Sequence, residues 1–167
     1  MSQPGQNITL DAPLEKIPVH LRGGTIIASQ TPGNTTKQTR LNPWSFIAAL
    51  DKNNQASGEL YMDDGVSLEP EDTDFVTFSF ANSTLTTHAT GSYVDNNSLQ
   101  NITIAGIKSS EDGYEEWKGW KGVSVTHGGN KVDCQGVKIG SAQNGVVRVQ
   151  GLDVASVFTR DLVLKLQ

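Results

Sequence analysis

Polar and apolar residues alternate along most of the chain with the period of two that is typical of β-strands. In the stretch Leu162–Leu166, for example, Leu alternates with Val and Lys. No stretch keeps the three-to-four spacing of an amphipathic helix for three turns. The pattern therefore predicts an all-β fold.

Turn signals divide this pattern into short strands. Gly128-Gly129-Asn130 and Asn144-Gly145 are hairpin signals, because these residues suit the positive φ of two-residue β-turns. So many short strands joined by tight turns predict antiparallel sheets packed as one or more β-sandwiches. The expected strands are Ile17–Leu21, Thr25–Ala28, Phe46–Asp51, Gly58–Asp63, Phe75–Phe80, Thr84–Thr90, Gln100–Ile107, Val123–His127, Val146–Val149 and Leu162–Leu166.

Composition narrows the class of protein. Apolar residues make up 36% of the 167 positions and charged residues 19%, which is typical of a globular chain rich in turns. The net charge of −5, with no Lys or Arg cluster, provides no attraction for a phosphate backbone and argues against nucleic acid as a partner. The longest apolar run, Phe46–Leu50, is too short to span a membrane, and no leader peptide is recognisable at the start.

The residue types that bind metals are scattered. Cys134 is the single cysteine, so no internal disulfide is possible, and we interpret it as a small buried thiol. The three His residues have no zinc-site spacing. The acidic run Glu69–Asp74 lacks the ligand spacing and central Gly of an EF-hand, which favours a solvated loop. We expect neither a metal nor a cofactor.

Five Asn residues stand in N-glycosylation sequons: Asn7, Asn34, Asn82, Asn96 and Asn101. The composition would give roughly two such triplets by chance. The excess favours a secretory route and a glycoprotein. The alternative is that a β surface rich in Asn and Thr produces sequons incidentally, and an Asn that faces a core could not be glycosylated.

The segment Ile8–Ile27, with the sequence ITLDAPLEKIPVHLRGGTII, closely resembles the segment that follows the catalytic barrel in family 31 α-glucosidases of the maltase, glucoamylase and lysosomal type. The likeness continues through Asn34–Thr36, Phe46–Asp51 and Gly58–Gly65. Family members often carry Trp at the position of Met62.

The resemblance weakens but persists toward the C-terminus. Leu99–Lys108 and Val123–Val132 are similar to strands of the family's distal C-terminal β-sandwich, whereas Glu111–Gly122 looks like an insertion. The resemblance implies two units, residues 1–57 from the proximal C-terminal sandwich and residues 58–167 as the distal one. A unit of under sixty residues buries little surface alone, so the first should pack on something else.

The resemblance also implies where the chain begins. Its first residues would lie inside the proximal sandwich, whose earlier strands would be upstream. We therefore expect either an exposed apolar edge or a partner that supplies those strands, namely the barrel and remaining domains of a parent enzyme.

Catalysis within this chain is not expected. Retaining glycosidases need two carboxylates about 5–5.5 Å apart that face one sugar. Asp63 and Asp64 are neighbours on or beside a strand, so their side chains point to opposite faces. The aspartate motifs that the family places on its barrel strands do not occur in this sequence. The resemblance therefore supplies no catalytic residue.

Aromatic residues in the predicted insertion are the candidates for carbohydrate binding. Tyr114, Trp117 and Trp120 could present flat apolar ring faces to a glucan. The alternative is that these rings are buried and anchor a long loop to its sheet. Trp44, just ahead of a strand, is interpreted as structural.

Three hypotheses remain. The leading one is a non-catalytic portion of an α-glucosidase that supports the catalytic barrel, while the parent enzyme performs retaining hydrolysis of terminal α-linked glucose from maltooligosaccharides or starch. The second is a carbohydrate-binding module that acts through Trp117 and Trp120. The third is an independent glycosidase.

Overall fold

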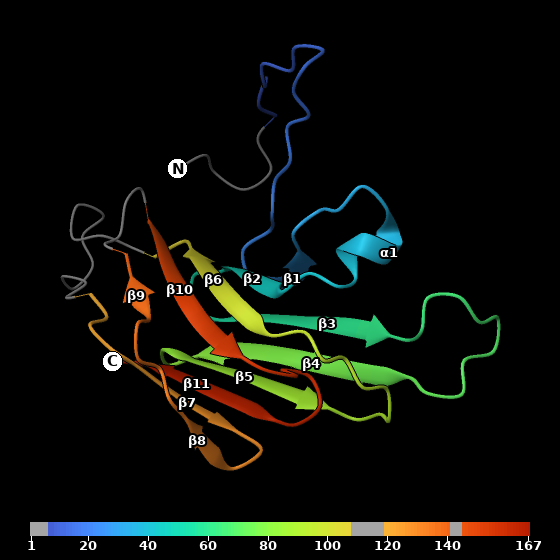
Figure 1. Cartoon of the computed structure of the whole chain (residues 1–167). Helices are drawn as coiled ribbons and strands as arrows, with labels where there is room; N and C mark the ends of the chain where they lie inside the picture. Colours follow the sequence, from blue (N-terminus) through green and yellow to red (C-terminus); the bar gives the residue numbers. More distant parts are fainter. Residues whose placement is uncertain (1–6, 108–118, 141–144) are drawn as a thin grey trace.

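The computed structural model describes residues 7–107, 119–140 and 145–167 (Figure 1). In this part of the chain, eleven strands form one sheet with the order β8-β7-β11-β5-β4-β3-β1-β2-β6-β10-β9. The strands are β1 (Thr25–Gln30), β2 (Trp44–Ala49), β3 (Ala56–Met62), β4 (Asp74–Ala81), β5 (Thr84–Ala89), β6 (Leu99–Ala105), β7 (Val123–His127), β8 (Asn130–Val132), β9 (Lys138–Ile139), β10 (Val146–Val154) and β11 (Leu162–Leu166). The prediction of an all-β fold is confirmed.

The sheet is mixed, which the alternation pattern did not reveal. Most neighbouring strands run antiparallel, but β1 runs parallel to β3 and β2 runs parallel to β6. After β2 the chain turns at residues 50–55 and crosses to the far side of β1, where it continues as β3. The strand β3 therefore pairs with β1 instead of with its predecessor in the sequence.

The sheet curls over on itself and encloses an aromatic core. Phe46 on β2 and Phe78 on β4 lie with their ring centroids 4.9 Å apart, although β1 and β3 stand between these strands in the sheet order. Phe158, in the turn before β11, packs on both rings and on Trp44. Strands from both predicted units thus share one core. The division at residue 57 stays a prediction.

The hairpin prediction at residues 128–130 is confirmed. Gly128 and Gly129 form the two-residue turn between β7 and β8, with φ values of +56° and +80°. Asn82 and Ser83 make the equivalent turn between β4 and β5, also with positive φ. Gly145 has a φ of +71°, while its predicted turn partner Asn144 lies outside the described residues.

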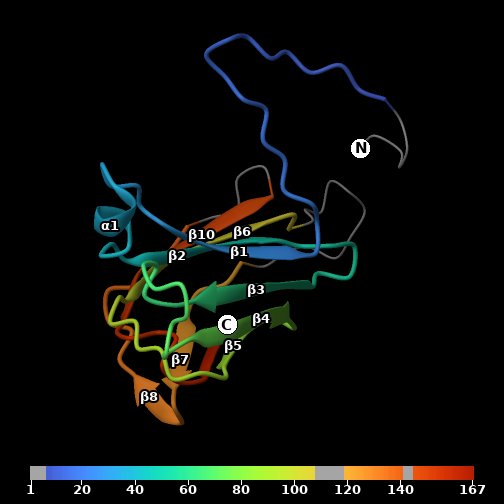
Figure 2. The same ribbon diagram turned by 90° about the vertical axis from the view of Figure 1, so that its right-hand side faces the viewer.

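Two local predictions were wrong. No strand forms at Ile17–Leu21, and residues 7–22 instead form an extended arm that leaves the sheet at β1 (Figure 2). Alternation predicts a strand without saying whether a pairing edge lies within reach, and the arm pairs with none of the described strands. A short helix, α1 (Thr36–Thr39), was also missed. It is started by Thr35, whose hydroxyl accepts a hydrogen bond from Gln38 N at 3.2 Å.

Candidate functional site

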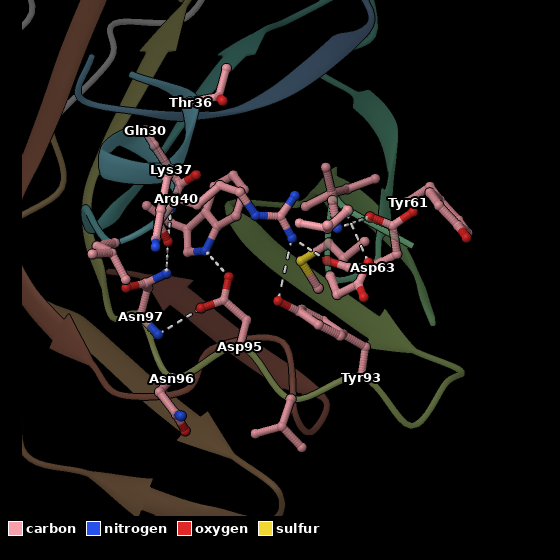
Figure 3. A pocket seen from close by; sticks show the side chains of 18 residues that line it. Gln30, Thr36, Lys37, Arg40, Tyr61, Asp63, Tyr93, Asp95, Asn96 and Asn97 are labelled. Atoms are coloured by element: carbon pink, nitrogen blue, oxygen red, sulfur yellow. Dashed lines mark hydrogen bonds between the residues drawn. The ribbon is translucent and has the colours of Figure 1, made fainter. Parts of the chain in front are cut away.

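A cleft of about 670 Å³ opens between α1, the end of β3 and the segment 93–97 (Figure 3). Residues at the end of β3 and in the loop that leads into β6 both line it. The polar residues that line it are Gln30, Thr36, Lys37, Arg40, Tyr61, Asp63, Asp64, Tyr93, Asp95, Asn96 and Asn97.

Arg40 lies at the centre of this cleft. Its Nη2 donates to the backbone carbonyl oxygen of Asp63 and to the hydroxyl of Tyr93, the latter at 3.3 Å. Gly65 lies against the guanidinium, and a Cβ at that position would be 2.4 Å from Arg40 Nη1. Gly65 also has a φ of +69°. The turn at Asp64-Gly65 therefore lies directly against the guanidinium of Arg40.

Asp95 fixes the opposite wall of the cleft. Its Oδ2 accepts from Trp44 Nε1 at 2.8 Å, and its Oδ1 accepts from Asn97 N at 2.7 Å. Asn97 in turn donates from its side chain to the backbone oxygen of Arg40 at 2.7 Å. These three bonds connect the wall to β2 and to the residue that follows α1. The structural interpretation of Trp44 is consistent with this bond and with its burial.

The two adjacent aspartates at the end of β3 are engaged in separate turns. Asp63 Oδ1 accepts from Gly65 N at 2.7 Å, while Asp64 accepts from the Ser67 hydroxyl and from Val66 N and Ser67 N. The Ser67 hydroxyl and the two backbone amides lower the pKa of Asp64 to about 2. A general acid at neutral pH needs a raised pKa. This cleft suits hydrogen bonding to a ligand better than proton transfer.

Of the aromatic residues predicted to bind sugar, Tyr114 and Trp117 lie outside the described residues. Trp120 is partly buried, and its ring stands edge-on to Phe80 with centroids 6.3 Å apart. Its Nε1 donates to Ser83 Oγ at 3.1 Å. These contacts tie Trp120 to the β4–β5 turn, as expected of an anchoring residue. Sugar binding by this group stays a prediction.

The sequons differ in their surroundings. Asn7, Asn34, Asn82 and Asn96 are exposed. Asn101 lies on β6 between β2 and β10, is partly buried, and donates from its side chain to Ser45 Oγ at 3.5 Å. Four of the five sequon Asn residues are therefore exposed to solvent, and one is partly buried within the sheet.

Other sequence-based interpretations can also be placed. Cys134 is partly buried, and burial raises the pKa of its thiol. Among the described residues, no three His, Cys, Asp or Glu side chains are grouped in a way that could hold a metal ion. No helix in this part of the chain is long and apolar enough to cross a membrane.

Sequence analysis missed the residues at the centre of the cleft. Arg40, Tyr93, Asp95 and Asn97 come from segments that no local motif connects, since Arg40 is 53 positions before Tyr93. The dipeptide Asp64-Gly65 is a turn signal that could have indicated a chain reversal here, but it does not identify Arg40 as the partner.

Comparison with known proteins gives close relatives, although no family model matches the chain. An α-glucosidase of Aspergillus oryzae is 39% identical in an alignment of 167 positions that covers 98% of this chain and 16% of that protein. A family 31 glucosidase of Schizosaccharomyces pombe is 42% identical over 104 residues. This second match covers 62% of this chain and 10% of that protein.

The fold agrees with these matches. The Tris-bound crystal structure of a glucosidase II α subunit superposes with a TM-score of 0.73 and 25% identity. That superposition covers 95% of this chain and 18% of the larger one. The chain therefore spans less than a fifth of the length of these relatives. Sequence and fold together show that the chain belongs to the family 31 α-glucosidases and corresponds to their C-terminal region.

Proposed function

We propose that this chain is a non-catalytic portion of a family 31 α-glucosidase that packs against the catalytic barrel and supports it. The parent enzyme would hydrolyse terminal α-linked glucose from maltooligosaccharides or starch with retention of configuration. The observation that carries this proposal is the apolar arm formed by residues 7–22.

The arm exposes large apolar side chains that a free protein would normally bury. Leu14 is fully exposed, Ile17 is 86% exposed and Val19 is 82% exposed. Its backbone carries a turn hydrogen bond from Lys16 N to Pro13 O, but none of its residues belongs to the sheet. Burying one such side chain contributes about 1.5–3 kcal/mol. The arm is therefore suited to a surface that the rest of the parent enzyme would provide.

The sheet continues this apolar surface where the arm leaves it. Ile27 on β1 and Ile47 on β2 are register partners on the outer face, with exposures of 43% and 39%. Exposed apolar residues that lie together mark interaction sites. We define the docking surface as the arm together with Ile27 and Ile47.

A supporting, non-catalytic role also agrees with the hydrogen bonding of the three aspartates in the cleft. Asp63, Asp64 and Asp95 each accept hydrogen bonds within their own loops. The lowered pKa of Asp64 keeps this group ionised at neutral pH, which does not suit a proton donor.

We further infer that the parent enzyme passes through the secretory pathway and is glycosylated. The exposed sequons at Asn34, Asn82 and Asn96 support this proposal, because each leaves room for a glycan. The solved structures that share this fold include an ER glucosidase II heterodimeric complex.

A chimeric enzyme tests the docking surface. The matching segment of the Aspergillus oryzae α-glucosidase is replaced by this chain, once unchanged and once with Ile17→Asp and Val19→Asp. We expect the unchanged chimera to be secreted and active, and the double variant to lose thermal stability and yield. In the isolated chain, the same two substitutions should leave the unfolding midpoint unchanged.

Leu68→Asp is the matched control, because Leu68 is fully exposed but belongs to the β3–β4 loop and not to the docking surface. It should leave the chimera as stable as the unchanged one. A double variant with the stability and activity of the unchanged chimera would contradict the proposal.

A further inference from the structure

The cleft around Arg40 is large and preorganised enough to be a ligand site that is separate from the docking surface. Its volume of about 670 Å³ lies within the range of small-molecule sites, which is about 300–1,000 Å³. The side chains of Arg40 and Asp95 are held by two hydrogen bonds each, so a ligand would not have to order them.

The polar groups of the cleft still have hydrogen-bonding capacity. Within the described residues, Asp63 Oδ2 accepts no hydrogen bond, and Arg40 Nη1 and Nε donate none. The Tyr61 hydroxyl also stands at the rim without a hydrogen-bond partner in this part of the chain. A ligand with several hydroxyl groups could bond to these atoms together.

Charged residues of both signs line the cleft. Arg40 and Lys37 are positive, whereas Asp63, Asp64 and Asp95 are negative. A phosphate or a polyamine would meet repulsion from part of this lining as well as attraction. The mixture favours a neutral polar ligand over a charged one.

The rim of the cleft is apolar. Leu41, Tyr61, Val66 and Val94 line the opening, with exposures between 56% and 89%. Aromatic and aliphatic side chains of this kind can pack against the apolar faces of sugar rings. Figure 3 shows the Asn96 side chain directed away from Arg40, so a glycan on this sequon would lead away from the cleft.

From this combination we propose that the cleft binds a short neutral oligosaccharide, with Asp63 and Arg40 bonding to its hydroxyl groups and Tyr61 packing on a sugar ring. The choice of an α-glucan as the oligosaccharide rests on the family membership and on the proposed parent activity. Trp120 does not line this cleft.

The test is an amide NMR titration of the isolated chain with maltotriose, isomaltotriose and cellotriose. Titration to about 10 mM nearly saturates a site with a Kd of about 1 mM. We expect saturable shifts with maltotriose at residues around the cleft. Tyr61→Ala and Asp63→Asn should each weaken binding about tenfold, because each removes one packed or hydrogen-bonded contact. Asn at position 63 keeps the oxygen that accepts from Gly65 N.

Phe75→Ala is the matched control. Phe75 is the register partner of Tyr61, is 42% exposed, and does not line the cleft, so its removal should leave binding unchanged. The absence of saturable shifts with all three sugars would overturn the proposal, and so would shifts centred on Trp120. Equal binding of cellotriose and maltotriose would overturn the assignment to α-glucans. Because the titration uses the isolated chain, its result is independent of the chimera experiment on the docking surface.

Discussion

Replacing Gly65 with Ala tests whether the Asp-Asp-Gly turn is built around Arg40. The new Cβ would lie 2.4 Å from Arg40 Nη1, so the guanidinium would have to leave its position. That movement breaks the hydrogen bonds to the Asp63 carbonyl and the Tyr93 hydroxyl. Two such bonds contribute about 0.5–1.5 kcal/mol each. The φ of +69° adds about 1–2 kcal/mol of strain for a residue with a Cβ.

The expected loss for Gly65→Ala is therefore about 2–5 kcal/mol in the free energy of unfolding. Gly129→Ala is the matched control, since Gly129 has a φ of +80° but a Cβ there would meet nothing within 4 Å. It should lose about 1–2 kcal/mol from strain alone. Urea unfolding of the isolated chain measures both values.

A double-mutant cycle with Arg40→Ala isolates the contact between the two residues. In the Arg40→Ala background, Gly65→Ala should cost no more than Gly129→Ala, because the clash is gone. The same loss for Gly65→Ala in both backgrounds would refute the reasoning, as would equal losses for Gly65→Ala and Gly129→Ala in the unchanged chain.

Three further predictions follow from the fold. Gly58→Ala should cost about 3 kcal/mol in thermal unfolding, because its Cβ would lie 2.1 Å from the backbone oxygen of Ile26; Gly122→Ala, which would meet nothing within 4 Å, should cost far less. The ionised Asp64 contributes stability above its ordinary pKa of 3.8, and this stability is lost as the pH falls toward about 2. Asp64→Asn should therefore make the free energy of unfolding less dependent on pH in this range; an unchanged acid transition would contradict the lowered pKa of Asp64. The intact mass of the chain secreted from yeast should decrease by one glycan in each of Asn34→Gln, Asn82→Gln and Asn96→Gln, whereas Asn101→Gln should show no glycan loss.

Alternation predicted the strands well because it reports the two faces of a strand directly. The order of the strands in the sheet was harder to predict from the sequence. The parallel pairing of β2 with β6 joins residues that are 55 or 56 positions apart, and no local pattern indicates that β1 lies between β2 and β3. Strand order depends on how the whole core packs, with Phe46, Phe78 and Phe158 meeting from three distant segments.

The candidate site was harder to predict than the fold. Its central residue, Arg40, follows a four-residue helix that has no apolar periodicity, and its bonding partners are 23 and 53 positions away. The arm was predicted as a strand because Ile17, Val19 and Leu21 alternate with polar or Pro residues. The same alternation of apolar and polar residues is expected in an extended segment that packs one face on another domain, as we propose for the arm.

Turnover by the isolated chain tests the central claim most directly. The chain at high concentration is incubated with a chromogenic α-glucoside, beside the variants Asp63→Asn, Asp64→Asn and Asp95→Asn. We predict no hydrolysis above the buffer rate and no difference among the four proteins. Hydrolysis that one of these substitutions abolishes would contradict a supporting role and place the chemistry within this chain.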